Sequence, residues 1–168
     1  MIKNINYLFV TFFGIGTIRY APGTITSLIT TILLFSFFHI LNLSNVIILT
    51  LLVIVFLYSF YAVTDYISEN QNKDPKEVVI DEVIGQSIPI YLYEIAHGSV
   101  KSSNEAFLFY LYMFLLFRYF DIKKPFPISY FDKNFKNSFG VIIDDVIAGI
   151  YVVLTLIIFM IIKSKLFP

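Results

Sequence analysis

Three short motifs in this sequence combine ionisable side chains with apolar flanks. Two are adjacent pairs of acids and the third places an arginine three residues before an aspartate: Asp81-Glu82, Asp144-Asp145, and Arg118 with Asp121. The five carboxylates suit a hard divalent cation such as Mg²⁺, which takes oxygen ligands from carboxylates, water and phosphate. The chain has no Cys and two His, which argues against zinc and against a cysteine nucleophile.

Each motif also has a purely structural explanation. Asp81 or Asp144 could cap a helix, and Arg118 could form a local ion pair with Asp121. The three motifs together favour a functional site, because several uncompensated acids beside apolar runs carry a heavy desolvation cost for capping alone.

A Gly/Pro-rich stretch near the N-terminus adds a candidate anion site. It ends in Pro22-Gly23-Thr24, and we expect Thr24 to be the N-cap of the helix that follows. A helix N-terminus offers free N–H groups and a positive dipole to a phosphate. The stretch lacks the Walker spacing and its lysine, so it supports a phosphate site only in company with a metal site.

The composition places these motifs in a membrane protein. The 168 residues are 58% hydrophobic and 14% charged, with a mean hydropathy of +0.80, whereas soluble domains have about 25% charged residues. Twelve basic and twelve acidic residues cancel, so we expect the lipid bilayer as a partner and no nucleic acid. We expect an all-α integral membrane protein, a single membrane-embedded domain over residues 1–168 with a bundle of about four to five transmembrane helices, some of them short.

The apolar runs and their breaks predict the individual helices. Residues 1–13 should form an interfacial helix that stays in the mature protein, since no small-x-small cleavage site follows. The clear spans are 28–41, 46–63 and 141–162, and the weaker segments are 83–96 and 106–121, the latter stopped by Pro125. Residues 65–82 should form a loop in water, and 122–140 are polar as well. Segment 83–96 is short, so a short span, a re-entrant segment and a buried helix all stay open.

The topology is predicted from the number of membrane crossings and from the distribution of Lys and Arg. If both weak segments cross the membrane, the Gly/Pro stretch and both polar segments lie on one face. Most Lys and Arg residues then fall on that face, with Lys101, Lys163 and Lys165 on the other, which makes the motif-bearing face cytoplasmic. Four spans with a re-entrant segment would split the polar segments between two faces. His39 and His97 are expected to be structural.

The order and spacing of these motifs resemble the phosphatidylglycerophosphatase A family over nearly the whole chain. The residues that carry the resemblance are Gly14-x-Gly16, Ala21-Pro22-Gly23-Thr24 with Ser27-Leu28, Asp81-Glu82-x-x-Gly85, Phe117-Arg118-x-x-Asp121-x-x-Lys124-Pro125-x-Pro127-Ile128, Phe131-Asp132, Gly140 and Asp144-Asp145-x-x-Ala148-Gly149. The resemblance implies a multi-pass enzyme of the bacterial cytoplasmic (inner) membrane. It would use Mg²⁺ to hydrolyse phosphatidylglycerol phosphate to phosphatidylglycerol and inorganic phosphate, a step of phospholipid biosynthesis.

This resemblance gives each motif an expected role. The expected metal ligands are Asp81, Glu82, Asp121, Asp144 and Asp145, which with Arg118 and Lys124 form the expected catalytic set. The groups expected to bind the substrate phosphate are Gly23, Thr24, Ser27, Arg118 and Lys124. Which carboxylate acts as base stays open, as does the choice between direct attack by water and an aspartyl-phosphate intermediate.

Two other functions stay open as well. A phosphatase for another lipid phosphate or an isoprenoid phosphate would need the same residue types. A small ion transporter would use intramembrane carboxylates as an ion path and would distribute them through the membrane depth. The sequence gives no indication of the oligomeric state.

Overall fold

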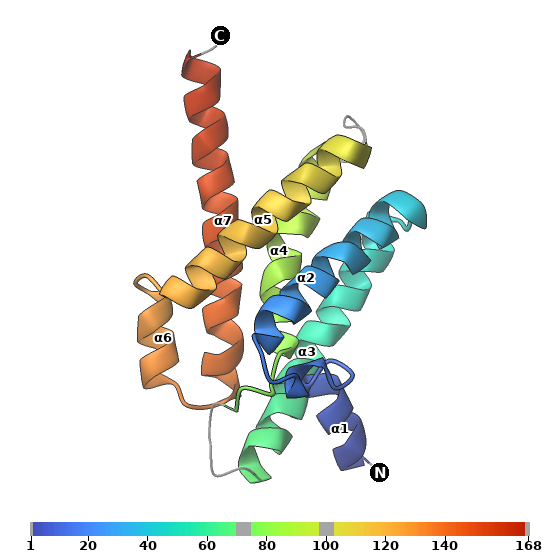
Figure 1. The fold of residues 1–168 in the computed structure, drawn as a ribbon, viewed down its shortest axis with the longest axis vertical. Coiled ribbons are helices and arrows are strands. Elements are labelled where there is room, and N and C mark those ends of the chain that lie inside the picture. Colours follow the sequence, from blue (N-terminus) through green and yellow to red (C-terminus); the bar gives the residue numbers. More distant parts are fainter. Residues whose placement is uncertain (1, 70–74, 98–102, 167–168) are drawn as a thin grey trace.

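The computed structural model describes residues 2–69, 75–97 and 103–166, and these are almost entirely helical (Figure 1). The α-helices of these ranges are α1 (Ile2–Val10), α2 (Pro22–Phe35), α3 (Asn45–Glu69), α4 (Ile80–His97), α5 (Ser103–Lys123), α6 (Ile128–Asn134) and α7 (Ser138–Leu166). A 3₁₀ turn, η1 (Ile15–Thr17), precedes α2, and a π-helical segment, η2 (Ser36–Ile40), continues it. The expected all-α fold is confirmed, with no strand in the described ranges.

Three of the described helices are long and apolar enough to cross a membrane: Pro22–Ile40, Asn45–Ser68 and Ser138–Leu166. They match the three clear spans of the sequence, with helix ends that differ from the apolar runs by several residues: α7, for example, covers Ser138–Leu166 rather than 141–162. α2 already begins at Pro22, because the fixed φ of proline suits the first turn of a helix. α3 runs past Asp65 to Glu69, because polar side chains can extend a helix beyond its apolar run. Part of the expected loop 65–82 is therefore helical, and residues 70–74 lie outside the described ranges.

α4 is the central helix of the bundle and contains the ambiguous segment 83–96 (Figure 1). It contacts α2, α3, α5 and α7, and ten of its residues are buried although Pro89 interrupts its hydrogen bonding. The segment therefore lies mostly inside the bundle, packed among the other helices. Neither α4 nor α5 belongs to the three described helices that reach the length and hydropathy of a span.

Small residues let α4 and α7 pack at close range. A Cβ atom on Gly85 would lie 2.6 Å from the carbonyl oxygen of Asp145, and a Cβ atom on Gly149 would overlap the carbonyl oxygen of Gly85. Small residues such as Gly85 and Gly149 allow helices to approach this closely. This approach brings the first turn of α4 alongside the N-terminal part of α7.

The polar segment 122–140 contains a short helix that its sequence pattern does not reveal. α5 ends at Lys123, as Pro125 predicts, and Lys124 adopts a left-handed backbone conformation with φ of 43°. After a cis Phe126–Pro127 bond the chain forms α6, which packs on α7 through the fully buried Ile128.

Near the C-terminal end of α4, a buried acid joins three helices. Glu94 accepts a hydrogen bond from the Tyr110 hydroxyl of α5 at 2.8 Å and lies 3.1 Å from Nε2 of His39 in η2. This position is about 20 Å along α4 from Asp81. His39 thus occupies a structural position, as expected, whereas Glu94 is a buried acid that the sequence pattern does not single out.

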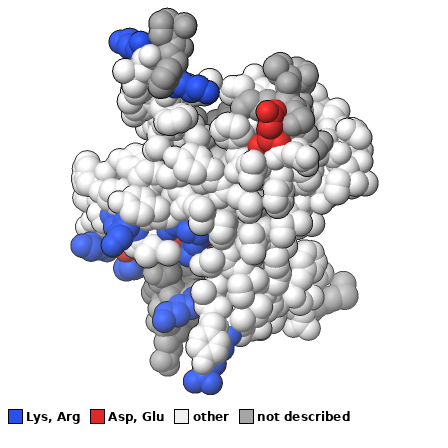
Figure 2. Space-filling view, turned by 45° about the horizontal axis from the view of Figure 1, so that its top comes forward, with Lys and Arg blue, Asp and Glu red and all other residues white. Residues whose placement is uncertain are grey.

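The surface is apolar over most of the long helices. Side chains such as Leu57 of α3 and Ile158 of α7 are more than half exposed, at 64% and 56%. Figure 2 shows Lys and Arg side chains in the lower half of one face and at the C-terminal end of α7, with a broad band between that has none. Exposed apolar surface of this extent suits contact with lipid, so the chain is a membrane protein.

Candidate active site

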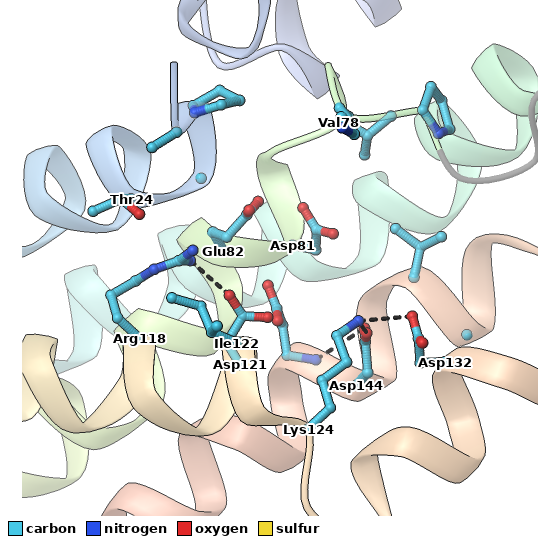
Figure 3. Close-up of a pocket in the computed structure, with 18 of the residues that line it drawn as sticks. Thr24, Val78, Asp81, Glu82, Arg118, Asp121, Ile122, Lys124, Asp132 and Asp144 are labelled. Atoms are coloured by element: carbon cyan, nitrogen blue, oxygen red, sulfur yellow. Dashed lines mark hydrogen bonds and ion pairs between the residues drawn. The ribbon is translucent and has the colours of Figure 1, made fainter. Parts of the chain in front are cut away.

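A pocket of about 370 Å³ opens where α2, α4 and α7 begin and α5 ends (Figure 3). All seven residues of the expected catalytic set line it, and so do Gly23 and Thr24. The three motifs lie far apart in the sequence, and the parallel course of α2 and α4 together with the reversed course of α5 brings them to one end of the bundle. The acids of these motifs therefore gather at helix ends rather than along the membrane depth.

Three carboxylates meet at the base of this pocket. Asp81 and Glu82 project from the first turn of α4 and Asp145 from α7, and one carboxylate oxygen of each lies within 4.8 Å of the other two. Oδ1 of Asp81 and Oε2 of Glu82 are shielded from solvent and have no hydrogen-bond partner within the described part of the chain. Buried acids without donors need another positive partner when they are ionised.

The pKa values of Asp81 and Glu82, the two acids on α4, are both raised. Burial, reinforced by the charge of Glu82, raises the pKa of Asp81 well above its usual range. Burial raises the pKa of Glu82 to about 7, although its hydrogen bond with Asp81 and the charge of Arg118 act in the opposite direction. The pair is therefore poised to take up a cation, or protons in its absence.

The arginine motif forms one wall of the pocket. Nη1 of Arg118 lies 2.7 Å from Oδ2 of Asp121, so the i, i+3 pairing expected on α5 is present. The same nitrogen donates to the Ser27 hydroxyl of α2 at 3.5 Å, and that hydroxyl donates to the Gly23 carbonyl at 2.8 Å. Arg118 is thus held in place from both α5 and α2, with Nε buried and unpaired within the described residues.

The lysine after α5 forms the opposite wall. Nζ of Lys124 lies 2.7 Å from Asp132 of α6 and 2.7 Å from Asp144 of α7, so its ammonium group joins three elements (Figure 3). Burial alone would lower the pKa of Lys124, but the charges of Asp144 and Asp132 outweigh it and raise the pKa above its ordinary value. A left-handed φ is rare for a lysine, and such backbone strain is concentrated at functional sites.

Gly23 lies where α2 meets the Glu82 side chain of α4. A Cβ atom there would overlap Oε1 of Glu82 and approach Nη1 of Arg118 to 3.4 Å. One expectation for this region is wrong. The N-cap of α2 is Ala21 rather than Thr24, because Pro22 occupies the first helical position. Ser27 is fully buried behind Arg118 and does not line the pocket.

Comparison with known proteins identifies the family of this chain. The family model of phosphatidylglycerophosphatase A matches residues 8–160. The chain belongs to the phosphatidylglycerophosphatase A family. A phosphatidylglycerophosphatase A of Haemophilus influenzae is 38% identical over 84% of this chain and 80% of its own length. A Bacteroides thetaiotaomicron protein, described as a candidate phosphatidylinositol-3-phosphatase, is 31% identical over 83% of each chain. No solved structure matches this chain.

Membership in the phosphatidylglycerophosphatase A family makes the protein a lipid phosphatase, a hydrolase of phosphoric monoesters. The donor set of its pocket fits a divalent metal ion. Among the described residues, six carboxylates and four cationic side chains line the pocket, which leaves a formal deficit of two positive charges when all of these are ionised. Among the described residues that line it, none is His or Cys, so the available side-chain donors are oxygen atoms, as hard cations prefer.

Three of the five expected metal ligands lie close enough together that they could hold one ion. Asp81, Glu82 and Asp145 form the cluster, while Asp121 and Asp144 are each bonded to a cationic side chain. In the sequence, Asp121 and Asp144 look like the other three acids, since all five lie beside apolar runs. Such a pattern does not reveal whether an acid will pair with a cationic side chain or face other acids.

The pocket also contains charged residues that the motifs do not single out as site residues. They are Lys76, Asp132 and Lys136. Asp132 occurs within the block that carries the family resemblance, but its link to Lys124 depends on the fold of α6. Lys76 and Lys136 lie in segments that connect helices and belong to none of the motifs.

Proposed function

We propose that this protein is a Mg²⁺-dependent phosphatase that converts phosphatidylglycerol phosphate to phosphatidylglycerol and inorganic phosphate. The observation that carries the proposal is the cluster of Asp81, Glu82 and Asp145 in a pocket walled by Arg118 and Lys124. One oxygen each of Asp81 and Glu82 is buried there without a hydrogen-bond partner among the described residues. The Haemophilus relative, by its name, acts on this lipid. The whole chain, residues 1–168, would act as one membrane-embedded domain.

The three clustered carboxylates would hold the ion. Mg²⁺ bound there would supply positive charge to the phosphate and acidify a water molecule. Oxygen donors in an acidic pocket favour Mg²⁺ over softer ions, and Mg²⁺ ordinarily keeps several waters and binds one or two carboxylates plus substrate phosphate.

The two cationic walls would bind the phosphate. Arg118 offers a planar fork of donors and Lys124 a compact point charge, and both are already fixed by carboxylates before substrate enters. Fixed donors stabilise the charge that develops on the phosphoryl oxygens without reorganisation. Asp121 and Asp144 would orient these cations, and Gly23 and Thr24 would line the side of the phosphate site facing α2.

Hydrolysis breaks the bond between phosphorus and the glycerol oxygen, and a water oxygen replaces the leaving alkoxide, which takes a proton. Either water or a carboxylate of the cluster attacks first. Rapid acid quenching during turnover separates the two routes: an acid-trapped phosphoprotein would exclude direct attack by water.

We further propose that the pocket opens at the cytoplasmic face of the bacterial inner membrane. The Lys and Arg residues that line the pocket support this orientation, since Lys and Arg favour cytoplasmic segments. Cysteine residues introduced at positions 76 and 164 of this cysteine-free chain would test it. We expect an impermeant thiol reagent outside spheroplasts to label position 164 and not position 76, and the reverse labelling would refute the orientation.

Phosphate release by the detergent-purified protein tests the activity. We expect release from phosphatidylglycerol phosphate with Mg²⁺, none with excess EDTA, and slower release from phosphatidic acid. The Asp145→Asn variant is the matched negative control, because it keeps the size of the side chain and removes its charge. Failure of the folded protein to release phosphate from this lipid would refute the proposed substrate.

Phosphatidylinositol 3-phosphate is the second substrate to assay. The Bacteroides relative, at 31% identity, favours this candidate by its description. Both lipids carry a terminal phosphomonoester on a polyol that a phosphodiester links to diacylglycerol. Faster release from the inositol lipid would assign this chain to that substrate instead.

A further inference from the structure

Two lysines at the mouth of the pocket are not used by the proposed reaction. Lys76 precedes α4 and Lys136 lies between α6 and α7, and both line the pocket while their side chains are exposed. The inner cations are more enclosed, with 14% of the Arg118 side chain and 29% of the Lys124 side chain exposed. The pocket therefore has an inner and an outer pair of cations.

The two pairs differ in their partners. Arg118 is bonded to Asp121, and Lys124 is bonded to Asp132 and Asp144. Within the described part of the chain, neither Lys76 nor Lys136 has an ion-pair or hydrogen-bond partner. The outer pair is thus free to bind an anion that the inner site does not hold.

The proposed substrate has such an anion. Its phosphomonoester is at the end of the head group, and a phosphodiester lies three carbon atoms nearer to the diacylglycerol. When the monoester is at the inner site, the diester must lie toward the mouth. A pocket of about 370 Å³ falls in the usual range for small-ligand sites and can hold this phosphoglycerol group.

We propose that Lys76 and Lys136 form an outer anion subsite that binds the phosphodiester of the lipid head group and thereby selects lipids with a phosphodiester and a distal phosphomonoester. This proposal rests on the proposed function. Phosphatidic acid has its monoester directly on diacylglycerol and no phosphodiester, so it gains nothing from the subsite. The two lysines would set specificity and leave the chemical step to the inner groups.

The test is a double variant, Lys76→Met with Lys136→Met, assayed on both lipids in neutral detergent micelles. We expect KM for phosphatidylglycerol phosphate to rise about tenfold, as loss of charge-assisted contacts predicts. We expect kcat for that lipid, and kcat/KM for phosphatidic acid, to stay within twofold of wild type. A double change to Arg should restore most of the affinity, because it keeps both charges.

The matched control removes two positive charges at the other end of the protein, in Lys163→Met with Lys165→Met at the end of α7. It should leave both lipids unaffected. Unchanged KM in the pocket-mouth variant would overturn the subsite. An equal rise in KM for both lipids would also overturn it, because a general attraction of the basic surface to anionic lipid would then explain the effect.

Failure of the proposed function would look different. Wild-type protein would then release no phosphate from phosphatidylglycerol phosphate, and both proposals would fall. Turnover by wild type, with no selective change in the variant, would remove only the subsite.

Discussion

Replacing Gly85 by alanine tests whether the packing of α4 on α7 sets the spacing of the acidic cluster. The new Cβ atom would lie 2.6 Å from the carbonyl oxygen of Asp145 and 2.7 Å from Cε2 of Phe117. The phenyl ring can turn, but the carbonyl belongs to the backbone of α7. Reaching an ordinary contact of 3.4 Å requires about 0.8 Å of extra separation between the helices.

This separation acts directly on the cluster. Asp145 provides both the carbonyl that the methyl group displaces and the carboxylate that lies within 4.8 Å of Asp81 and Glu82. Mg²⁺ requires oxygen ligands at about 2.0–2.1 Å in near-octahedral geometry, so it tolerates such a displacement poorly. We expect kcat/KM to fall by about 100-fold, the loss associated with a misplacement of about 1 Å, and the Mg²⁺ concentration for half-maximal rate to rise.

The assay is phosphate release at a series of Mg²⁺ concentrations, with circular dichroism and size-exclusion chromatography to verify that the variant is folded. The second variant, Gly85→Ala with Phe117→Leu, relieves the contact with the ring and keeps the contact with the carbonyl. It should stay impaired. Recovery of activity in this double variant, or an unchanged Mg²⁺ requirement in Gly85→Ala, would refute the reasoning.

Four further predictions concern single groups. Asp145→Asn should lower kcat by about 100- to 1,000-fold and abolish the rise in Tm on adding Mg²⁺, measured by phosphate release and thermal melts. Lys124→Met leaves two acids without their cation and should lower stability by about 1–3 kcal/mol in denaturant titrations. In EDTA, Tm should fall as the pH rises from 5 to 8, because the raised pKa of Glu82, about 7, makes the folded state bind more protons than the unfolded chain in this range, and Mg²⁺ should reduce the difference. Glu94→Leu should lower stability by about 1–3 kcal/mol through the unpaired groups of His39 and Tyr110, with kcat/KM within twofold of wild type.

The sequence predicts the long helices well because apolar runs directly reflect the surroundings of a helix in lipid. The three clear spans appear as α2 with η2, α3 and α7. Their ends are less accurate, since helix formation at Glu69 or Pro22 depends on local backbone preferences rather than on hydropathy. The short helix α6 escapes prediction because its seven residues are held by packing of Ile128 on α7, not by an apolar period.

Membership in the pocket is also predictable from sequence, because acids beside apolar runs have few stable positions in a membrane protein. All seven residues of the expected catalytic set line the pocket. The sequence does not reveal which charged side chains within the pocket contact one another. Asp144 and Asp145 are neighbours with the same flanks, yet one faces Lys124 and the other faces the α4 pair.

That division follows from helix geometry and one backbone turn. Successive residues of α7 point about 100° apart, so its two acids must face different neighbours. The left-handed turn at Lys124 and the return of the chain through α6 bring an ammonium group to Asp144, and the glycine contact with α4 brings Asp145 to Asp81 and Glu82. One acid of the pair thus fixes a cation that can bind phosphate, while the other completes the cluster that can bind a metal ion. Exchanging their roles would require rotation of α7, which the contact at Gly149 opposes.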